Sequence, residues 1–100
     1  MIIVIARMEV DPEALPRLHP MLEAIMRAKW DESGCLSYSM AIEDAAGGVI
    51  SLVERWADEA ALAEHFKMPH MVSFEHSVKA HIRSLDARVY TVTGERQLTV

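Results

Sequence analysis

The sequence is poor in the residues that build disulfide frameworks, zinc fingers and nucleic-acid surfaces. Its one cysteine, Cys35, cannot form an intramolecular disulfide, and no cysteine pair has zinc-site spacing. Lys and Arg total 10 against 15 Asp and Glu, which gives a formal net charge of −5, and the basic residues are scattered along the chain. Because phosphate binding needs clustered Lys and Arg, this composition disfavours a nucleic-acid partner. The lone cysteine fits a reducing cytoplasm.

Glycine, proline and long apolar runs are also scarce. Four glycines and four prolines in 100 residues, with 25% charged residues, exclude collagen-like and low-complexity chains. The apolar run at residues 1–5 is short and charged residues follow it, so it predicts a first β-strand and not a signal peptide or a membrane anchor. We therefore expect a folded cytoplasmic protein with no membrane partner.

Hydrophobic residues are abundant, at 51% of a chain that is long enough for one domain only. A domain of this size removes roughly two thirds of its unfolded surface from water on folding. Some apolar surface is then left over, and self-association is the natural way to cover it. We expect residues 1–100 to form a single domain that assembles as a homodimer.

The spacing of apolar residues predicts seven elements in the order β-α-β-β-α-α-β. Strands are expected at 2–10, 35–42, 49–56 and 87–93, and helices at 12–32, 58–66 and 69–85. This order is that of a ferredoxin-like α+β fold with an antiparallel sheet. On the two middle strands the large side chains fall at even positions and should face the helices: Leu36, Tyr38, Met40, Ile42, Ile50, Leu52, Glu54 and Trp56. The last helix should bury His70, Phe74, Val78, Ile82 and Leu85.

The other face of the sheet is expected to be bare, because right-handed crossovers place all the helices on one side. Small and β-branched residues should pave it: Ser37, Ser39, Ala41, Ser51, Val53, Val89 and Thr91. Such an uncharged patch favours a two-fold partner. Residues 94–100 are expected to reach across this interface, and Arg55 at its edge to pair with a carboxylate of the other chain.

Four short motifs stand in order on this pattern of elements. They are Glu32-Ser33-Gly34-Cys35 followed by Tyr38, Glu54-Arg55-Trp56, Leu62-Ala63-Glu64-His65 and Pro69-His70-Met71. In order and spacing the chain resembles the antibiotic biosynthesis monooxygenase domain over nearly its whole length. The resemblance implies a dimeric α+β barrel, with two sheets face to face and a pocket in each subunit between sheet and helices.

The resemblance also implies a range of functions, since the family includes cofactor-free oxygenases of quinols and polycyclic phenols, haem-degrading relatives and isomerases. The first hypothesis is a cofactor-independent monooxygenase acting on a quinol or phenolic aromatic with dioxygen, needing neither metal nor flavin. Some oxygenases and haem-degrading relatives place a functional asparagine in the pocket, and this sequence has none. Its absence favours the alternative, a non-catalytic ligand-binding dimer or a small-carbonyl isomerase.

Under the first hypothesis, His65 is the base that accepts the phenolic proton, because imidazole titrates near neutral pH. Tyr38 is the catalytic partner that orients the substrate by a hydrogen bond. The expected substrate-binding residues are Trp56, Phe66, His70, Phe74, Leu52 and Glu54.

Each of these residues also has a structural interpretation. Trp56 can also be a tryptophan of the hydrophobic core. Tyr38 can also be a tyrosine packed in the core. Glu54 on an inward face calls for a partner, and an ion pair with Arg7 is the preferred one. The histidines at 65, 70, 76 and 81 are spaced by five, six and five, which does not place two metal ligands on one helical face.

Overall fold

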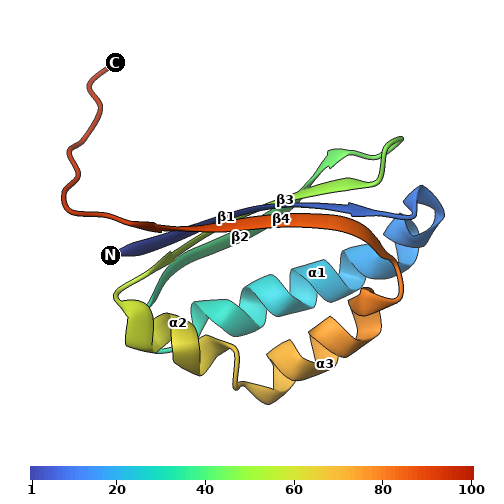
Figure 1. The fold of residues 1–100 in the computed structure, drawn as a ribbon, viewed down its shortest axis with the longest axis horizontal. Helices are drawn as coiled ribbons and strands as arrows, with labels where there is room; N and C mark the ends of the chain where they lie inside the picture. The colour runs from blue at the N-terminus through green and yellow to red at the C-terminus, as the bar shows by residue number, and fades with distance from the viewer.

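A single four-stranded sheet with helices on one face makes up the structure, a computed structural model that describes residues 1–100 (Figure 1). The strands are β1 (Ile2–Val10), β2 (Cys35–Asp44), β3 (Val49–Trp56) and β4 (Ile82–Thr91), all pairing antiparallel in the order β2-β3-β1-β4. A 3-10 turn, η1 (Pro12–Ala14), leads into α1 (Leu15–Trp30), and α2 (Glu59–His65) and α3 (Pro69–Lys79) connect β3 to β4. The predicted ferredoxin-like α+β fold is confirmed.

Helix α1 forms where the sequence predicts an amphipathic helix. The Asp11 carboxylate accepts a hydrogen bond from the backbone N–H of Glu13, which caps the entry to η1. Buried side chains then recur every three or four residues along α1: Leu15, Leu18, Leu22, Ile25 and Lys29. The helix continues through Pro20 and lies across the sheet with its apolar side on β2 and on α3.

The boundary between α3 and β4 differs from the expectation. Helix α3 ends at Lys79, and Ile82 and Leu85 lie on β4, where they pair with Val10 and Met8 of β1. The prediction of a helix to residue 85 and a strand from 87 was wrong. The four-residue spacing that favoured the helix is a local signal, and the backbone hydrogen bonds to β1 override it.

The faces of the strands also need two corrections. Val89 and Thr91 pair with Val4 and Ile2, whose side chains are buried under the helices, so they lie on the inner face and not on the bare outer one. A strand's register is fixed by its partner and cannot be obtained from the strand alone. Leu36 is 51% exposed, contrary to its predicted inward position, because the register of β2 shifts between Cys35 and Ser37.

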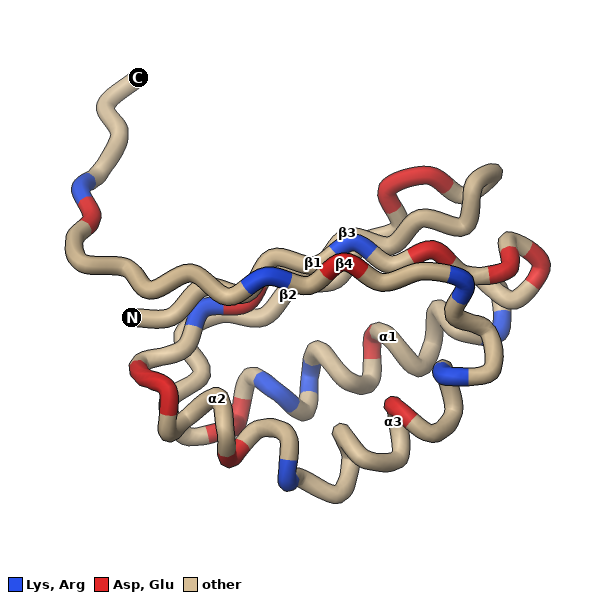
Figure 2. Tube along the Cα trace, viewed as in Figure 1, with Lys and Arg blue, Asp and Glu red and all other residues tan.

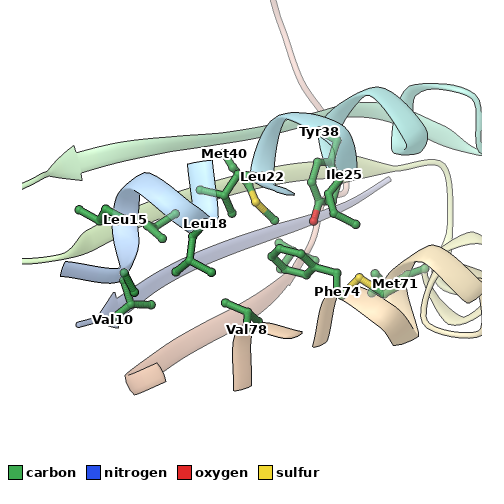
Figure 3. Close-up of a cluster of buried hydrophobic side chains, with 14 of the residues drawn as sticks. Val10, Leu15, Leu18, Leu22, Ile25, Tyr38, Met40, Met71, Phe74 and Val78 are labelled. Carbon is green, nitrogen blue, oxygen red and sulfur yellow. The ribbon is translucent and has the colours of Figure 1, made fainter. Parts of the chain in front are cut away.

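The core lies between the inner face of the sheet and α1 and α3. Figure 3 shows Leu22 and Ile25 of α1 on the side of Phe74 of α3, with Tyr38 and Met40 of β2 beside them. On the β4 side this cover is incomplete: Leu85 is 57% exposed although it is on the inner face. The helical layer is thus open along one edge.

Charges are spread over the whole molecule. Figure 2 shows Lys and Arg on both the sheet and the helices, interspersed with Asp and Glu. Residues after β4 carry no helix or strand and leave the sheet on the side away from the helices (Figure 1). None of the helices combines the length and apolarity that a membrane crossing requires.

Candidate active site

An apolar cavity of about 180 Å³ lies between the inner face of the sheet and helices α2 and α3. Five of the predicted site residues line it: Tyr38, Leu52, Glu54, Phe66 and Phe74. Hydrophobic side chains form nearly all of its wall, and its two carboxylates are Glu54 and the exposed Glu75 of α3. Such a cavity suits a small apolar ligand that carries one or two hydrogen-bonding groups.

Behind Glu54 lies a buried cluster of charged and polar side chains. Oε1 of Glu54 accepts a 2.8 Å hydrogen bond from the indole N–H of Trp56 and lies 3.7 Å from Nε2 of His65. On the other side of the imidazole, Nδ1 of His65 lies 3.1 Å from Oε2 of Glu32. The imidazole therefore lies between two carboxyl groups.

Glu32 is the centre of this cluster. Its Oε1 lies 2.8 Å from Nε2 of His70 and 3.4 Å from the ammonium of Lys29, which is fully buried. The Glu32 side chain is itself only 6% exposed. Three partners for one carboxylate satisfy the need that a buried charge has for compensation.

Local backbone geometry brings the members of this cluster together. Glu54 and Trp56 share the inner face because they are two residues apart on β3. The Asp58 carboxylate caps α2 by accepting a 2.8 Å hydrogen bond from the N–H of Ala61. Gly34 follows Glu32 at φ 81°, and a Cβ atom there would come within 2.5 Å of the Cβ of Ala61. This close approach, possible only for glycine, sets the Glu32 turn against α2.

Burial shifts the ionisation of the cavity-facing groups. Desolvation raises the pKa of the Glu54 carboxyl, and the hydrogen bond from Trp56 and the charge of Lys29 offset this only in part. Desolvation, with the charge of Lys29, lowers the pKa of His65 in spite of its contact with Glu32. The pKa of Tyr38 is raised far above its usual range, also by burial. The site thus holds a phenol that stays neutral and a neutral imidazole that can accept a proton.

The remaining predicted residues lie around the cavity. Trp56 is fully buried in the core and packs against His65, with 4.6 Å between ring centroids, and it does not line the cavity. His65 lines instead an open cleft of about 560 Å³ on the far side, together with Glu32. His70 is 34% exposed and joins the cluster through Glu32.

One predicted contact is wrong. Arg7 is exposed on the outer face and pairs with Glu43 at 3.3 Å, so it cannot be the partner of Glu54. Successive residues of a strand point to opposite faces of the sheet. Glu54 pairs with Val4 and shares its inner face, whereas Arg7, three residues after Val4, points to the outer face.

Two members of the cluster were not assigned a role from the sequence. Glu32 belongs to the first of the four sequence motifs, but the motif alone predicts no role for its carboxylate. Lys29 lies on the apolar stripe of α1, four residues after Ile25, and a cation at such a position was the signal that a buried acid lies opposite. No three His, Cys, Asp or Glu side chains converge as metal ligands do.

The fold and the cavity define a ferredoxin-like α+β protein with a small apolar site closed by a buried acid–imidazole cluster. Residues 1–77 match the family model described as antibiotic biosynthesis monooxygenase. The chain belongs to this family, which confirms the resemblance seen in its motifs.

One relative supports this membership, and a further solved structure shares the fold. A Mycobacterium tuberculosis protein named putative monooxygenase Rv0793 is 36% identical over 90 residues, which cover 90% of this chain and 84% of that protein. The structure of Rv0793 superposes with a TM-score of 0.84 at 31% identity, over 96% of this chain and 98% of the other. A Deinococcus radiodurans structure, described as a putative antibiotic biosynthesis monooxygenase, has a TM-score of 0.89 over the whole of both chains at 21% identity, a likeness of fold.

Proposed function

We propose that the protein is a cofactor-independent monooxygenase that oxidises a small quinol or phenolic aromatic in the apolar cavity. The observation that carries this proposal is the buried proton-accepting cluster of Glu54 and His65 at the polar end of a cavity that is otherwise apolar. Membership of a monooxygenase family supports the reaction type.

The ring of the substrate would pack among Leu52, Phe66 and Phe74, with its hydroxyl near Tyr38 and Glu54. Its O–H bond breaks, the proton passes to the acid–imidazole cluster, and the electron pair remains on the ring. The electron-rich anion then gives one electron to dioxygen, and the radical pair recombines to form a C–O bond. The peroxide anion that results takes back one proton from the acid–imidazole cluster and becomes a hydroperoxide. Loss of water from this hydroperoxide leaves a quinone, so one oxygen atom enters the product and the other leaves as water.

The apolar wall serves this chemistry in two ways. It excludes water, which would otherwise solvate the phenolate and lower its reactivity toward dioxygen. It also holds the radical pair together until recombination. Tyr38 stays protonated, because burial raises its pKa, and it can donate a hydrogen bond to the substrate oxygen.

We propose in addition that the single domain, residues 1–100, works as a cytoplasmic homodimer. Ile5, Val53 and Tyr90 are each about half exposed on the outer face of the sheet, and pairing with a second sheet would bury them. Residues 94–100 would extend this interface. Light scattering should give twice the chain mass of 11.2 kDa, and a stable monomer that is unchanged on removal of residues 95–100 would contradict the dimer.

The test of the oxygenase activity is oxygen uptake by the pure protein with a panel of small quinols and naphthols. Uptake above the uncatalysed rate, with the quinone as product, is expected for at least one compound. His65→Ala, which removes the imidazole of the proton-accepting cluster, should lower kcat by about 100-fold, the lower end of what acid–base catalysis contributes. His76→Ala, an exposed histidine of α3, is the matched control. No uptake with any compound would contradict the proposal.

A binding protein or a small-carbonyl isomerase is the second candidate. It is favoured by the composition of the cavity, whose buried polar groups, Tyr38 and Glu54, can hold a carbonyl and move a proton without oxygen. His65→Ala separates these functions, because a binding protein would keep its affinity within a few fold whereas either enzyme would lose turnover.

A further inference from the structure

His65 is not the titratable residue that faces the cavity. Its side chain is 1% exposed, and the surface it contributes belongs to the open cleft with Glu32 on the far side. The carboxyl that lines the cavity at this point is that of Glu54, which stands between the cavity and the imidazole. A substrate proton would therefore meet Glu54 first.

From Glu54 a continuous row of proton carriers leads to solvent. Oε1 of Glu54 is 3.7 Å from Nε2 of His65, Nδ1 of His65 is 3.1 Å from Oε2 of Glu32, and Oε1 of Glu32 is 2.8 Å from Nε2 of His70. His70 is one third exposed and also lines a shallow groove between α1 and α3. Carboxyl and imidazole groups alternate along the whole row.

One unpartnered atom marks the direction of this row. Nε2 of His65 is the one buried side-chain nitrogen or oxygen without a hydrogen bond, and the nearest carboxyl oxygen is that of Glu54. Buried polar atoms are ordinarily hydrogen-bonded, so an unpartnered one calls for an explanation beyond packing. If Nδ1 donates its hydrogen to Glu32, Nε2 carries a lone pair that faces Glu54, and the imidazole can accept a proton from that side.

We propose that Glu54 is the residue that takes the substrate's proton, and that His65, Glu32 and His70 form a path that carries this proton from the cavity to solvent. The proposal deepens the proposed function and rests on it. Glu54 is then the catalytic base, and the other three are positioning residues that act through it.

The steps balance as proton transfers. The phenolic O–H bond breaks and an O–H bond forms on Glu54, while the electron pair stays on the substrate. Glu54 passes the proton to Nε2 of His65, Nδ1 of His65 passes its own proton to Glu32, and Glu32 passes one to His70 and water. These transfers leave His65 protonated at Nε2 in place of Nδ1. Each group is restored when the peroxide formed on the substrate is protonated, because one proton then travels the same row in the opposite direction, from solvent to Glu54, and His65 regains its Nδ1–H.

The surroundings of Glu54 favour the transfer of a proton to its carboxylate. The groups that face it from the packed elements are Lys29 on α1, Glu32 after α1, Cys35 and Tyr38 on β2, Trp56 on β3, His65 on α2 and, beyond Glu32, His70 on α3. Burial raises the pKa of Glu54 and lowers that of His65. The raised pKa makes Glu54 a stronger acceptor for the phenolic proton, and the lowered pKa makes His65 readier to pass its Nδ1 proton on to Glu32.

The first experiment follows ionisation without oxygen. 4-Nitrophenol, whose phenolate is coloured, is bound anaerobically to the wild type and to Glu54→Gln. The wild type should ionise the bound phenol at a pH where Glu54→Gln binds it neutral, with affinities within a few fold. Glu54→Asp, which keeps the carboxyl, should restore ionisation, and Glu59→Gln, an exposed carboxylate of α2 outside the cavity, should behave as the wild type. Equal ionisation by Glu54→Gln would overturn the proposal.

The second experiment tests the solvent end of the proton path at His70, which is partly exposed and can be replaced without disturbing the core. In quinol turnover His70→Gln should lower kcat several-fold at unchanged KM, and added imidazole should restore it, whereas His76→Gln should show neither effect. Rescue by a small proton carrier is not expected of a structural role. A normal kcat for His70→Gln would overturn the path.

The outcomes separate the two proposals. Ionisation that depends on Glu54 without any oxygen uptake would reject the oxygenase and keep Glu54 as the base. Quinol oxidation at full kcat by Glu54→Gln would reject the role of Glu54 and keep the oxygenase.

Discussion

The indole of Trp56 donates a hydrogen bond to Glu54 and its ring packs on that of His65, at 4.6 Å between centroids and an angle of 43°. One buried side chain thus contacts both of the groups that are proposed to handle a proton next to the cavity. Trp56 acts on the site although it does not line the cavity, through the position of its neighbours and through the pKa of Glu54.

Trp56→Phe should keep an aromatic ring next to His65 and lose the N–H group that donates to Glu54. Because the hydrogen bond from Trp56 opposes the rise in the pKa of Glu54, its loss should move the alkaline-rising limb of the pH–rate profile to higher pH. Stability should fall by about 1–3 kcal/mol, the cost of leaving a buried acceptor unpaired. Urea denaturation measures the second effect. An unshifted pH profile would show that Glu54 does not control the rate.

Glu54→Gln should gain stability relative to the wild type as the pH rises. Burial raises the pKa of Glu54 in the folded state above its unfolded value, so between the two values the folded state binds more protons. The wild type therefore loses stability as the pH rises through this window, and the glutamine is spared the loss. Urea midpoints from mildly acidic to mildly alkaline pH test this. Glu75→Gln, on the exposed side of α3, should follow the wild type.

Gly34→Ala should displace α2 from the Glu32 turn. The residue has φ 81° and its Cβ would approach that of Ala61 to 2.5 Å, so a loss of about 1–3 kcal/mol is expected from backbone strain alone. His65 should separate from Glu32, which nuclear magnetic resonance of the imidazole nitrogens can detect. Gly94→Ala is the control, since nothing lies within 4 Å of its Cβ position. Equal stability of the two variants would contradict this role of Gly34.

Leu52 and Val53 are neighbours on β3 that face opposite sides of the sheet, and each serves as the control for the other. Leu52→Trp should fill the cavity and weaken the binding of 4-nitrophenol by at least about tenfold, because one lost 1.4 kcal/mol of packing has that effect, while leaving the oligomeric state unchanged. Val53→Lys should leave binding intact and lower the apparent mass in light scattering. Exchange of these two phenotypes would refute the assignment of the faces.

The sequence was sufficient for α1, α2 and the first three strands, because apolar residues recur in them with a regular spacing. It failed at the start of β4, where Ile82 and Leu85 fit a helix as well as a strand and only the pairing with β1 decides. It also failed for Val89, whose face depends on its partner Val4. The spacing of apolar residues describes a single helix or strand, whereas the face on which a strand residue lies depends on the strand with which it pairs.

The site was predictable in part for the same reason. His65, Tyr38 and Glu54 could be named from motifs and strand parity, and they do lie close together. The position of Glu32 could not be derived, since it depends on how closely the Gly34 turn approaches α2. Contacts between segments that are far apart in the chain, such as Glu32 with His70, leave no local pattern in the sequence.

The open edge along β4 allows the size of the cavity to change between related proteins. Leu85 and Ala87 line the cavity and yet are exposed and lie outside the buried core. Substitutions at these two positions alter the size of the binding site while the packing between α1, α3 and the sheet is left intact. Ligand choice is thereby uncoupled from folding, so that one scaffold can exchange one ligand for another without losing stability.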